Sequence, residues 1–476
     1  MNSIKNTKQK QVEDVIIVGA GAAGIAALSK LLDYGIENVK ILEAENRIGG
    51  RVHSIYFGDA YVDLGAEEVH GENGNIIVEL AKQFLNEKKS LTESICYCSK
   101  GNKVDKDVSE QIMKLIEDFC EDDSKVDKSI GHVFTERFSE TILKKYENDP
   151  SKIKIATSFL PLCESFFSIL EGPYSWFDVI LESASNYVDC KGDQFIGWNG
   201  YGCKTILEII MGKNPKRDDS IDEEIHYGNK ISLGKVVKKI SWNRGSTVRI
   251  ECDDGSSYFT KYVIFTPSVG VLREKHKEIF EPCLPEKKQH VLQKIGYSNV
   301  MKVALRFKNK WWNEVPMALL WTEDHSEDIG NSWLKSIHWL MGAPENPNVL
   351  VAWLTGPETT SVEKLSNDEI KNGIMKVLDK FLANDFEISE PVEIIPTRWH
   401  SNPNFRGTYS YETLETCKLE IPFQKTLEEP LRNEEGHPIV LFAGEATHLT
   451  QYSTVNGAIL SGYREAERIV GIRNKN

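Results

Sequence analysis

A glycine-rich turn near the start of the chain constrains its fold more than any other feature. The turn, residues 19–24 (Gly-Ala-Gly-Ala-Ala-Gly), follows Val15–Val18, a short apolar β-branched run typical of a buried parallel strand. After the turn, Ala22–Tyr34 has the composition of a helix, and Val39–Leu42 predicts a second strand. Together these segments predict a βαβ unit, and with it an α/β fold built on a parallel sheet.

The glycines of this turn match the G-x-G-x-x-G pattern of dinucleotide-binding sites. Gly19 permits the tight turn, Gly21 lets a pyrophosphate approach the backbone, and Gly24 lets the helix pack closely against the strand. The N-terminus of the helix offers unpaired N–H groups and a partial positive charge to the phosphates. The pattern alone is weak evidence, because an ordinary strand–turn–helix connection can also match it.

The residues after the second strand strengthen the dinucleotide interpretation and indicate the cofactor. Glu43 lies about 20 residues after the last glycine, where a carboxylate accepts hydrogen bonds from ribose hydroxyls and would repel the 2′-phosphate of NADP. A second glycine pair then follows, flanked by Arg47 and Arg51. This is more than an NAD site needs, although Arg47 taken alone would be an ordinary surface arginine. It suits a longer cofactor whose pyrophosphate meets both arginines, so we predict FAD.

The charge balance and the cysteines narrow the class of protein. The 476 residues include 57 Lys and Arg against 71 Asp and Glu, a formal net charge of −14. Because nucleic-acid binding rests on basic side chains, we expect no nucleic-acid partner, whereas an acidic protein suits cationic ligands. The nine cysteines form no C-x-x-C pair and no zinc-ligand spacing, so we expect reduced thiols and no metal site. We see no signal peptide and no apolar run that could cross a membrane, so we expect a cytoplasmic chain without a membrane partner.

The remaining sequence alternates between helical and strand-rich stretches. Residues 105–180 have the spaced apolar residues of helices, whereas residues 230–265 and 300–354 are rich in strand patterns. Near the C-terminus a strand, a glycine turn and a helix repeat the opening pattern. This order predicts a nucleotide-binding domain into which substrate-binding segments are inserted. The other elements expected are helices at residues 76–86 (with Asn75 as N-cap), 365–382 and 456–470, and a strand at 439–442.

Three runs of sequence carry a resemblance to a known family. Residues 15–51, 442–448 and 452–462 resemble flavin-containing amine oxidases, and among these most resemble the animal polyamine oxidases (spermine and N1-acetylpolyamine oxidases). The resemblance covers residues 12–472. It implies noncovalent FAD and the amine oxidase fold, in which a Rossmann-type FAD-binding domain is interleaved with an α+β substrate-binding domain. The FAD-binding domain would take residues 12–88, 200–292 and 420–472, and the substrate-binding domain the mostly helical 89–199 and the sheet-containing 293–419.

The resemblance also assigns residues to the cofactor. It implies that Gly65 and Ala66 lie against the flavin ring, and that the backbones of Val237 and Val455 meet the adenine and the ring. Thr408 stands where monoamine oxidases carry the cysteine bonded to flavin, which argues against covalent attachment. The complete set of expected cofactor residues is Gly19, Gly21, Gly24, Glu43, Arg47, Arg51, Gly65, Ala66, Val237, Trp399, Gly444, Glu445 and Val455.

Lys302 is the first candidate for catalysis. Strand alternation around it predicts one apolar face, while Lys302 and Arg306 share the other, which by itself describes an ordinary solvated face. The resemblance implies instead a lysine that holds a water beside flavin N5. The residues expected on the apolar face are Met301, Val303, Leu305 and Phe307.

Other candidates rest on the resemblance. His70 matches an active-site histidine and Tyr409 an aromatic residue that lines the substrate face of the flavin. Alone, His70 would more often be structural, and Tyr409 would as readily be core packing. Ser453 and Thr454 resemble a pattern whose hydroxyls could bind a substrate nitrogen, and Asn186 could face the substrate channel.

The segment around His70 departs from the family pattern. Glu68 stands where the family usually carries a tryptophan. One hypothesis is that Glu68 turns into solvent. The other is that Glu67 or Glu68 pairs with a distal ammonium group of a polyamine.

The resemblance implies an FAD-dependent polyamine oxidase that acts with O2, and we expect a monomer or weak homodimer. A hydride would pass from the carbon next to a secondary amine of spermine or an N1-acetylated polyamine to flavin N5. Hydrolysis of the imine would give an aldehyde and a shorter amine, and O2 would become H2O2. The alternatives are a catalytically idle FAD protein that serves as a binding module, and an oxidase of a different amine.

Overall fold

The glycine turn joins a parallel strand to a helix, as the sequence predicts. Strand β1 (Val12–Val18) runs into the turn, and helix α1 (Ala22–Asp33) begins after Gly21. Strand β2 (Val39–Leu42) pairs with β1 in parallel. Residues 15–18 are all buried, which explains why the run is apolar without alternation.

The computed structural model describes residues 12–87, 94–121, 126–181, 185–217, 229–243, 245–322, 331–344 and 346–474. The boundary expected between residues 88 and 89 lies outside these ranges.

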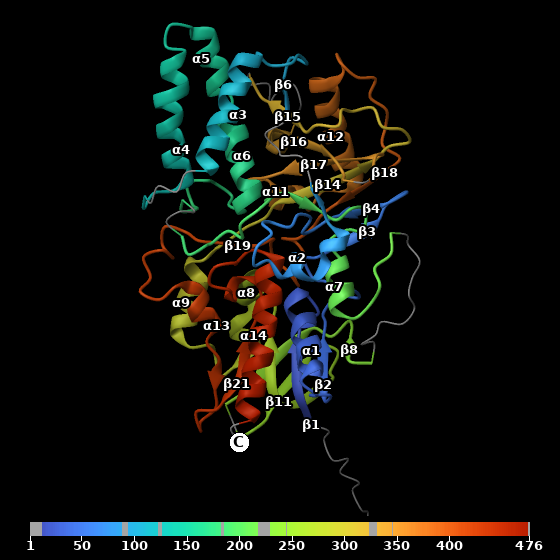
Figure 1. Ribbon diagram of the computed structural model, residues 1–476, viewed down its shortest axis with the longest axis vertical. Coiled ribbons are helices and arrows are strands. Elements are labelled where there is room, and N and C mark those ends of the chain that lie inside the picture. The colour runs from blue at the N-terminus through green and yellow to red at the C-terminus, as the bar shows by residue number, and fades with distance from the viewer. Residues whose placement is uncertain are drawn as a thin grey trace, which may run out of the picture.

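A nine-stranded sheet gathers strands from both ends and the middle of the chain. Strand β11 (Ser257–Phe265) pairs in parallel with β1 on one side and with β21 (Pro438–Phe442) on the other. The first and last strands of the chain's α/β pattern are therefore near neighbours in one sheet, in the lower half of Figure 1. The other strands of this sheet are β2, β8 (Ile231–Ser232), β9 (Val237–Ser241), β10 (Val248–Cys252), β12 (Phe280–Glu281) and β20 (Leu431–Arg432).

A second sheet, of six strands in the order β18-β14-β17-β16-β15-β6, lies in the upper half of Figure 1. Helix α12 (Asn367–Leu382) packs against it and begins with a capping box formed by Ser366 and Glu369. The strands are β6 (Ile95–Cys98), β14 (Met301–Arg306), β15 (Met317–Leu320), β16 (Ile337–Gly342), β17 (Val349–Leu354) and β18 (Glu393–Pro396).

Helices fill the segment between β6 and the return to the nine-stranded sheet, as expected. They are α3 (Lys106–Cys120), α4 (Ile130–Phe138), the π-helix η2 (Ser139–Leu143), α5 (Pro150–Thr157) and α6 (Leu160–Glu171). Contrary to expectation, one stretch, Pro150–Glu171, has the length and mean hydropathy (1.4) of a membrane-crossing helix. It forms α5 and α6, whose apolar side chains, among them Phe159, Leu162 and Phe166, are buried in the core of the helical region. This packing accounts for the high hydropathy.

The remaining elements connect these layers. Asn75 caps α2, as predicted, but α2 ends at Ala81 and not at residue 86, because the chain tightens into a 3₁₀ turn and then pairs as β5. These elements are β3 (Ser54–Tyr56), β4 (Tyr61–Asp63), α2 (Ile76–Ala81), η1 (Lys82–Phe84), β5 (Asn86–Glu87), β7 (Ile196–Gly197), α7 (Thr205–Ile210), α8 (Val269–Ile279), α9 (Glu286–Lys294), β13 (Gly296–Tyr297), η4 (Ser332–Ser336), α11 (Thr359–Val362), β19 (Ser410–Tyr411), α13 (Phe423–Glu428), η5 (Glu445–Thr447) and α14 (Val455–Arg473).

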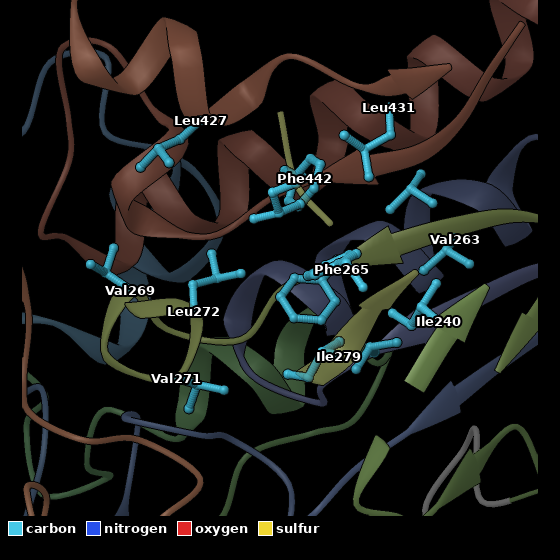
Figure 2. Packing of buried hydrophobic residues seen from close by; sticks show 14 of the residues in the cluster. Ile240, Val263, Phe265, Val269, Val271, Leu272, Ile279, Leu427, Leu431 and Phe442 are labelled. Atoms are coloured by element: carbon cyan, nitrogen blue, oxygen red, sulfur yellow. The ribbon is translucent and has the colours of Figure 1, made fainter. Parts of the chain in front are cut away.

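One apolar cluster joins the middle of the chain to its C-terminal part. Figure 2 shows Phe265 of β11 facing Phe442 of β21, and their ring centroids are 6.0 Å apart. Side chains of α8 close the cluster from one side, and Leu427 and Leu431 close it from the other. Because these residues are almost fully buried, their burial holds the segments of the nine-stranded sheet in one body.

Helices α1 and α14 pack so closely over this sheet that at one point there is no room for a side chain between them. A Cβ atom at Gly462 of α14 would overlap the carbonyl oxygen of Ala23 in α1. Gly471, on the same helix, has nothing within 4 Å of the corresponding position.

We expect Gly462→Ala to destabilise the protein by about 1–3 kcal/mol, because α1 and α14 must separate to admit the methyl group. Gly471→Ala is the matched control, and it should be neutral or stabilising by about 0.5–1 kcal/mol. Thermal unfolding of both variants measures the difference. Equal melting temperatures for the two variants would contradict the close packing.

Candidate active site

A cavity of about 1370 Å³ lies where segments of the two sheets meet. Its lining includes part of the glycine turn, residues 64–70, Lys302, residues 403–405 and 408–409, and the start of α14. Ligand pockets commonly measure about 300–1,000 Å³, so this cavity can hold a long cofactor together with a substrate.

The glycine turn borders the cavity in the way that a phosphate site requires. Gly19 has φ +101, which favours glycine, and a Cβ at Gly24 would overlap the carbonyl oxygen of Gly19. A Cβ at Gly21 would instead stand 3.9 Å from its nearest neighbours, Gly49 and Gly50. Gly24 therefore serves helix packing, and Gly21 leaves open the space that a pyrophosphate would fill at the N-terminus of α1.

Glu43 marks the nucleotide end of the cavity. Its carboxylate accepts hydrogen bonds from the backbone N–H groups of Ala20 (2.5 Å) and Glu45 (2.7 Å), and burial raises its pKa. Each oxygen keeps a lone pair for a ribose hydroxyl. Lys235 and Val237 line the same cavity, and the N–H of Lys235 donates to the Glu43 carbonyl.

The two predicted arginines have different surroundings. Among the described residues, Arg51 lines the cavity and Arg47 does not. Arg51 forms an ion pair with Glu445 (2.9 Å) and donates to the Thr408 carbonyl (2.5 Å). Arg47 donates to two carbonyls of its own loop, those of Ile48 and Gly50. The placement gives Arg47 the role of shaping the loop and leaves Arg51 at the cavity wall.

The other predicted cofactor residues come from four separate segments of the chain. Gly65, Ala66, Trp399, Gly444, Glu445 and Val455 all line the cavity. A Cβ at Gly65 would overlap the carbonyl of Arg51, and Trp399 donates its ring N–H to the Leu64 carbonyl (3.2 Å). The cavity thus combines a buried carboxylate, an open helix N-terminus and a wall packed closely around Gly65, and these features fit an extended FAD.

Lys302 lies inside the fold, not on a solvated face. The predicted apolar face of β14 is buried against α12, and Lys302 projects from the other face into the cavity wall. Its Nζ donates to Glu67 Oε2 (2.7 Å) and to the carbonyls of Asp63 (3.1 Å) and Gly65 (3.0 Å), and lies 4.4 Å from the Trp353 ring centroid. Three protein acceptors thus match the three N–H bonds of the ammonium.

His70 and Tyr409 also line the cavity, and each is held by a backbone carbonyl. His70 Nδ1 lies 2.7 Å from the Gln194 carbonyl, which can only accept, so Nδ1 carries the hydrogen and Nε2 is left as the basic atom. The Tyr409 hydroxyl donates to the Ile169 carbonyl (2.6 Å). Burial, and secondly the charge of Glu171, raise the pKa of Tyr409, so this tyrosine stays neutral.

The predicted substrate residues are only partly brought together. Glu68, Ser453 and Thr454 line the cavity, whereas Asn186 is not among its described lining residues and binds Glu412 through its side chain (3.2 Å) and its N–H (3.0 Å). The Thr454 hydroxyl caps α14 by accepting from the Gly457 N–H (2.9 Å), and it donates to the Gln451 carbonyl (2.8 Å). The Ser453 hydroxyl donates to the Ser410 carbonyl.

The sequence analysis missed most of the acidic side chains of the cavity wall. Glu171 ends α6, and burial together with the nearby Asp189 raises the pKa of Glu171 to about 7. A carboxylate at the end of an otherwise apolar helix is the one signal that could have indicated Glu171. The other acidic residues missed are Asp189 and, at the end of α3, Glu117, Asp118 and Glu121. No group of three or more His, Cys, Asp or Glu residues in the described ranges is placed to hold a metal ion.

The chain is similar along nearly its whole length to proteins of one known family. The family model for flavin containing amine oxidoreductase matches residues 22–470. The chain is 28% identical to the peroxisomal N(1)-acetyl-spermine/spermidine oxidase of Homo sapiens and 27% identical to that of Bos taurus, over 96% of this chain and 95% and 94% of those proteins. It is 26% identical to polyamine oxidase 1 of Zea mays, over 97% of this chain and 91% of that protein.

A solved structure shows the same fold. A putrescine oxidase double mutant with redesigned cofactor binding superposes with a TM-score of 0.66 at 17% identity, over 97% of this chain and 100% of that one. This likeness confirms the predicted amine oxidase fold.

We expect Gly21→Val to fold but to lose FAD by about tenfold or more in affinity, because the valine would occupy the space left for the pyrophosphate. Gly21 has φ −76, which valine can adopt, and the neighbouring backbone leaves room for its Cβ. Flavin absorbance and the melting temperature of the apoprotein separate the two effects. Full flavin content in Gly21→Val would contradict this position for the pyrophosphate.

Proposed function

The chain belongs to the family of flavin-containing amine oxidoreductases and is an FAD-dependent amine oxidase, and we propose that its substrate is a polyamine. The observation that carries the proposal is the acidic wall of the cavity. The described lining holds nine carboxylates and five basic side chains. Three of the basic side chains, Arg51, Lys235 and Lys302, are paired with carboxylates. A negative cavity attracts an elongated polycation and repels anionic substrates.

When bound, FAD would supply the acceptor for a hydride and would pass two electrons to O2, which with two protons would leave as H2O2. The protein must bind the amine with an uncharged nitrogen next to the carbon that loses the hydride. Tyr409, Trp353 and Phe166 line the cavity, and such apolar walls favour the neutral amine by desolvation. Water then hydrolyses the imine to an aldehyde and a shorter amine.

Glu171 is the residue we assign to a charged nitrogen of the substrate. Glu171 lies in the cavity wall, close enough to Tyr409 to affect the pKa of that tyrosine. Burial, and secondly the charge of Asp189, raise the pKa of Glu171. Two carboxylates in one partly buried site repel each other, and a cation between them relieves the repulsion. Glu68 lines the same cavity and is a second candidate for this contact. Glu67, the other acidic candidate in that segment, is bound to Lys302.

His70 and Tyr409 complete the proposed site. Nε2 of His70 can take or return a proton, since Nδ1 is held by a carbonyl. Tyr409 stays protonated and provides an apolar ring that tolerates a cation. The mammalian relatives are named as peroxisomal, and the cytoplasmic location expected for this chain stays a prediction.

The function is tested by mixing the oxidised protein with amines in the absence of O2. We expect spermine or N1-acetylspermine to bleach the flavin, admission of air to restore its colour, and mass spectrometry to identify a shortened amine and an aldehyde. Bleaching only by an unrelated monoamine would favour an oxidase of a different amine. A flavin that no amine bleaches would favour the idle binding module.

We expect Glu171→Gln to raise the KM for spermine by about tenfold or more above pH 7, because the variant removes the charge that attracts the ammonium. Since the pKa of Glu171 is raised to about 7, the wild-type carboxyl is charged above that pH and neutral below it. The ratio of the KM of Glu171→Gln to the KM of the wild type should therefore shrink as the pH falls below 7. Glu110→Gln, an exposed acid of α3 that is paired with Lys106, is the control and should leave the KM unchanged. A ratio that is independent of pH would contradict this role of Glu171.

A further inference from the structure

The ion pair between Lys302 and Glu67 has no place in the proposed substrate contacts. The side chains are 7% and 19% exposed, and Nζ and Oε2 are 2.7 Å apart. The remaining N–H bonds of the ammonium go to the carbonyls of Asp63 and Gly65, so one five-residue segment supplies all three acceptors. The segment 63–67 is thus wrapped around one buried positive charge.

The position of this pair along the cavity follows from the direction of the cofactor. A dinucleotide whose ribose meets Glu43 and whose pyrophosphate crosses the N-terminus of α1 extends away from Glu43. Lys302, Gly65 and Glu67 line the same cavity, and in Figure 1 the strands β4 and β14 next to them lie in the upper half, whereas β2, which Glu43 follows, lies in the lower half. The redox-active end of a bound cofactor would therefore lie on the side of the cavity that holds the pair.

At this end of the cavity, the net charge of the ion pair would act on the flavin and on O2. Charges act strongly on one another in a partly buried site, because the effective dielectric constant is far below that of water. A lone ammonium would stabilise both the extra negative charge of the reduced flavin and the negative charge that develops on O2 as it accepts electrons. A carboxylate at 2.7 Å cancels most of this effect, since the distant field of a close ion pair is that of a small dipole.

We propose that Glu67 is a positioning residue that fixes and neutralises the Lys302 ammonium, and thereby sets the reduction potential of the flavin and its rate of reaction with O2. In the reaction concerned, reduced flavin gives up two electrons, and O2 takes them with two protons to become H2O2. The proposal depends on bound FAD and not on which amine is oxidised, so it stands apart from the polyamine assignment.

Four proteins form the test: the wild type, Glu67→Gln, Lys302→Met and the double variant. Relative to the wild type, their local charge changes by zero, +1, −1 and zero. We expect the flavin midpoint potential to rise in Glu67→Gln, to fall in Lys302→Met and to return close to the wild-type value in the double variant. The rate of reoxidation by air after photoreduction should follow the same order, several-fold faster in Glu67→Gln and slower in Lys302→Met. Neither measurement uses an amine.

Two further variants sharpen the test. Glu67→Asp keeps the charge and should keep a potential near the wild type, which separates charge from shape even if Lys302→Met binds FAD poorly. Glu393→Gln removes the ion-pair partner of Arg306, which lies on β14 as Lys302 does. Neither Arg306 nor Glu393 is in the described lining of the cavity, so this variant should change neither readout. Measurement at pH 8 keeps Asp63 in one charge state, since burial raises its pKa to about 6.

Three results would overturn the proposal. The first is a Glu67→Gln protein with the potential and reoxidation rate of the wild type. The second is a shift of both single variants in the same direction, which would indicate a structural role only. The third is a double variant that keeps the effect of Lys302→Met, which would mean that the lysine acts without its partner.

Discussion

The parallel pairing of β11 with both β1 and β21 is the constraint on which the rest of the structure depends. It places the glycine turn, which follows β1, at the same edge of the sheet as Gly444 and Glu445, which follow β21, with only β11 between the two strands. The ion pair between Arg51 and Glu445 then joins segments from the two ends of the chain across the cavity wall. Without that sheet order the cavity would lose one of its walls, because neither end of the chain encloses the space alone.

Within that frame, charge is distributed unevenly along the cavity. The end that holds the nucleotide has a helix N-terminus and Arg51, and both suit phosphates. The wall near Tyr409 has apolar rings with Glu171 and Asp189 close by, an arrangement that suits a molecule with alternating methylene groups and nitrogens. The buried ammonium of Lys302 is not a free charge in the cavity, because it donates to Glu67 and to two carbonyls. The site thus keeps an uncharged environment at its reactive end and negative charge farther along.

Much of the fold could be predicted from sequence, because it depends on local patterns. The βαβ unit, the helical region and the apolar face of β14 follow from the spacing of apolar residues, and burial confirms them, whereas the face of Lys302 is not solvated as that spacing suggests. The early end of α2 could not be predicted, since it is set by the pairing of β5 with β7, far away in the chain. The apolar stretch that forms α5 and α6 does not stand out as one run in the sequence, because Lys152, Lys154 and Glu164 interrupt it, and part of it is buried in the helical core.

The site was less predictable than the fold, because its chemistry lies in contacts between distant residues. The charge relation between Glu171 and Asp189, and the pairing of Lys302 with Glu67, leave no trace in local spacing. Thr454 carried a usable signal, since a threonine directly before a helix favours the N-cap position that it occupies. The most direct measurement of the central claim is the cofactor content of the purified protein. The account predicts a yellow protein with one FAD per chain, released into solution by heat denaturation. A protein that stays colourless after reconstitution with FAD, or one whose flavin stays bound to the denatured chain, would contradict it.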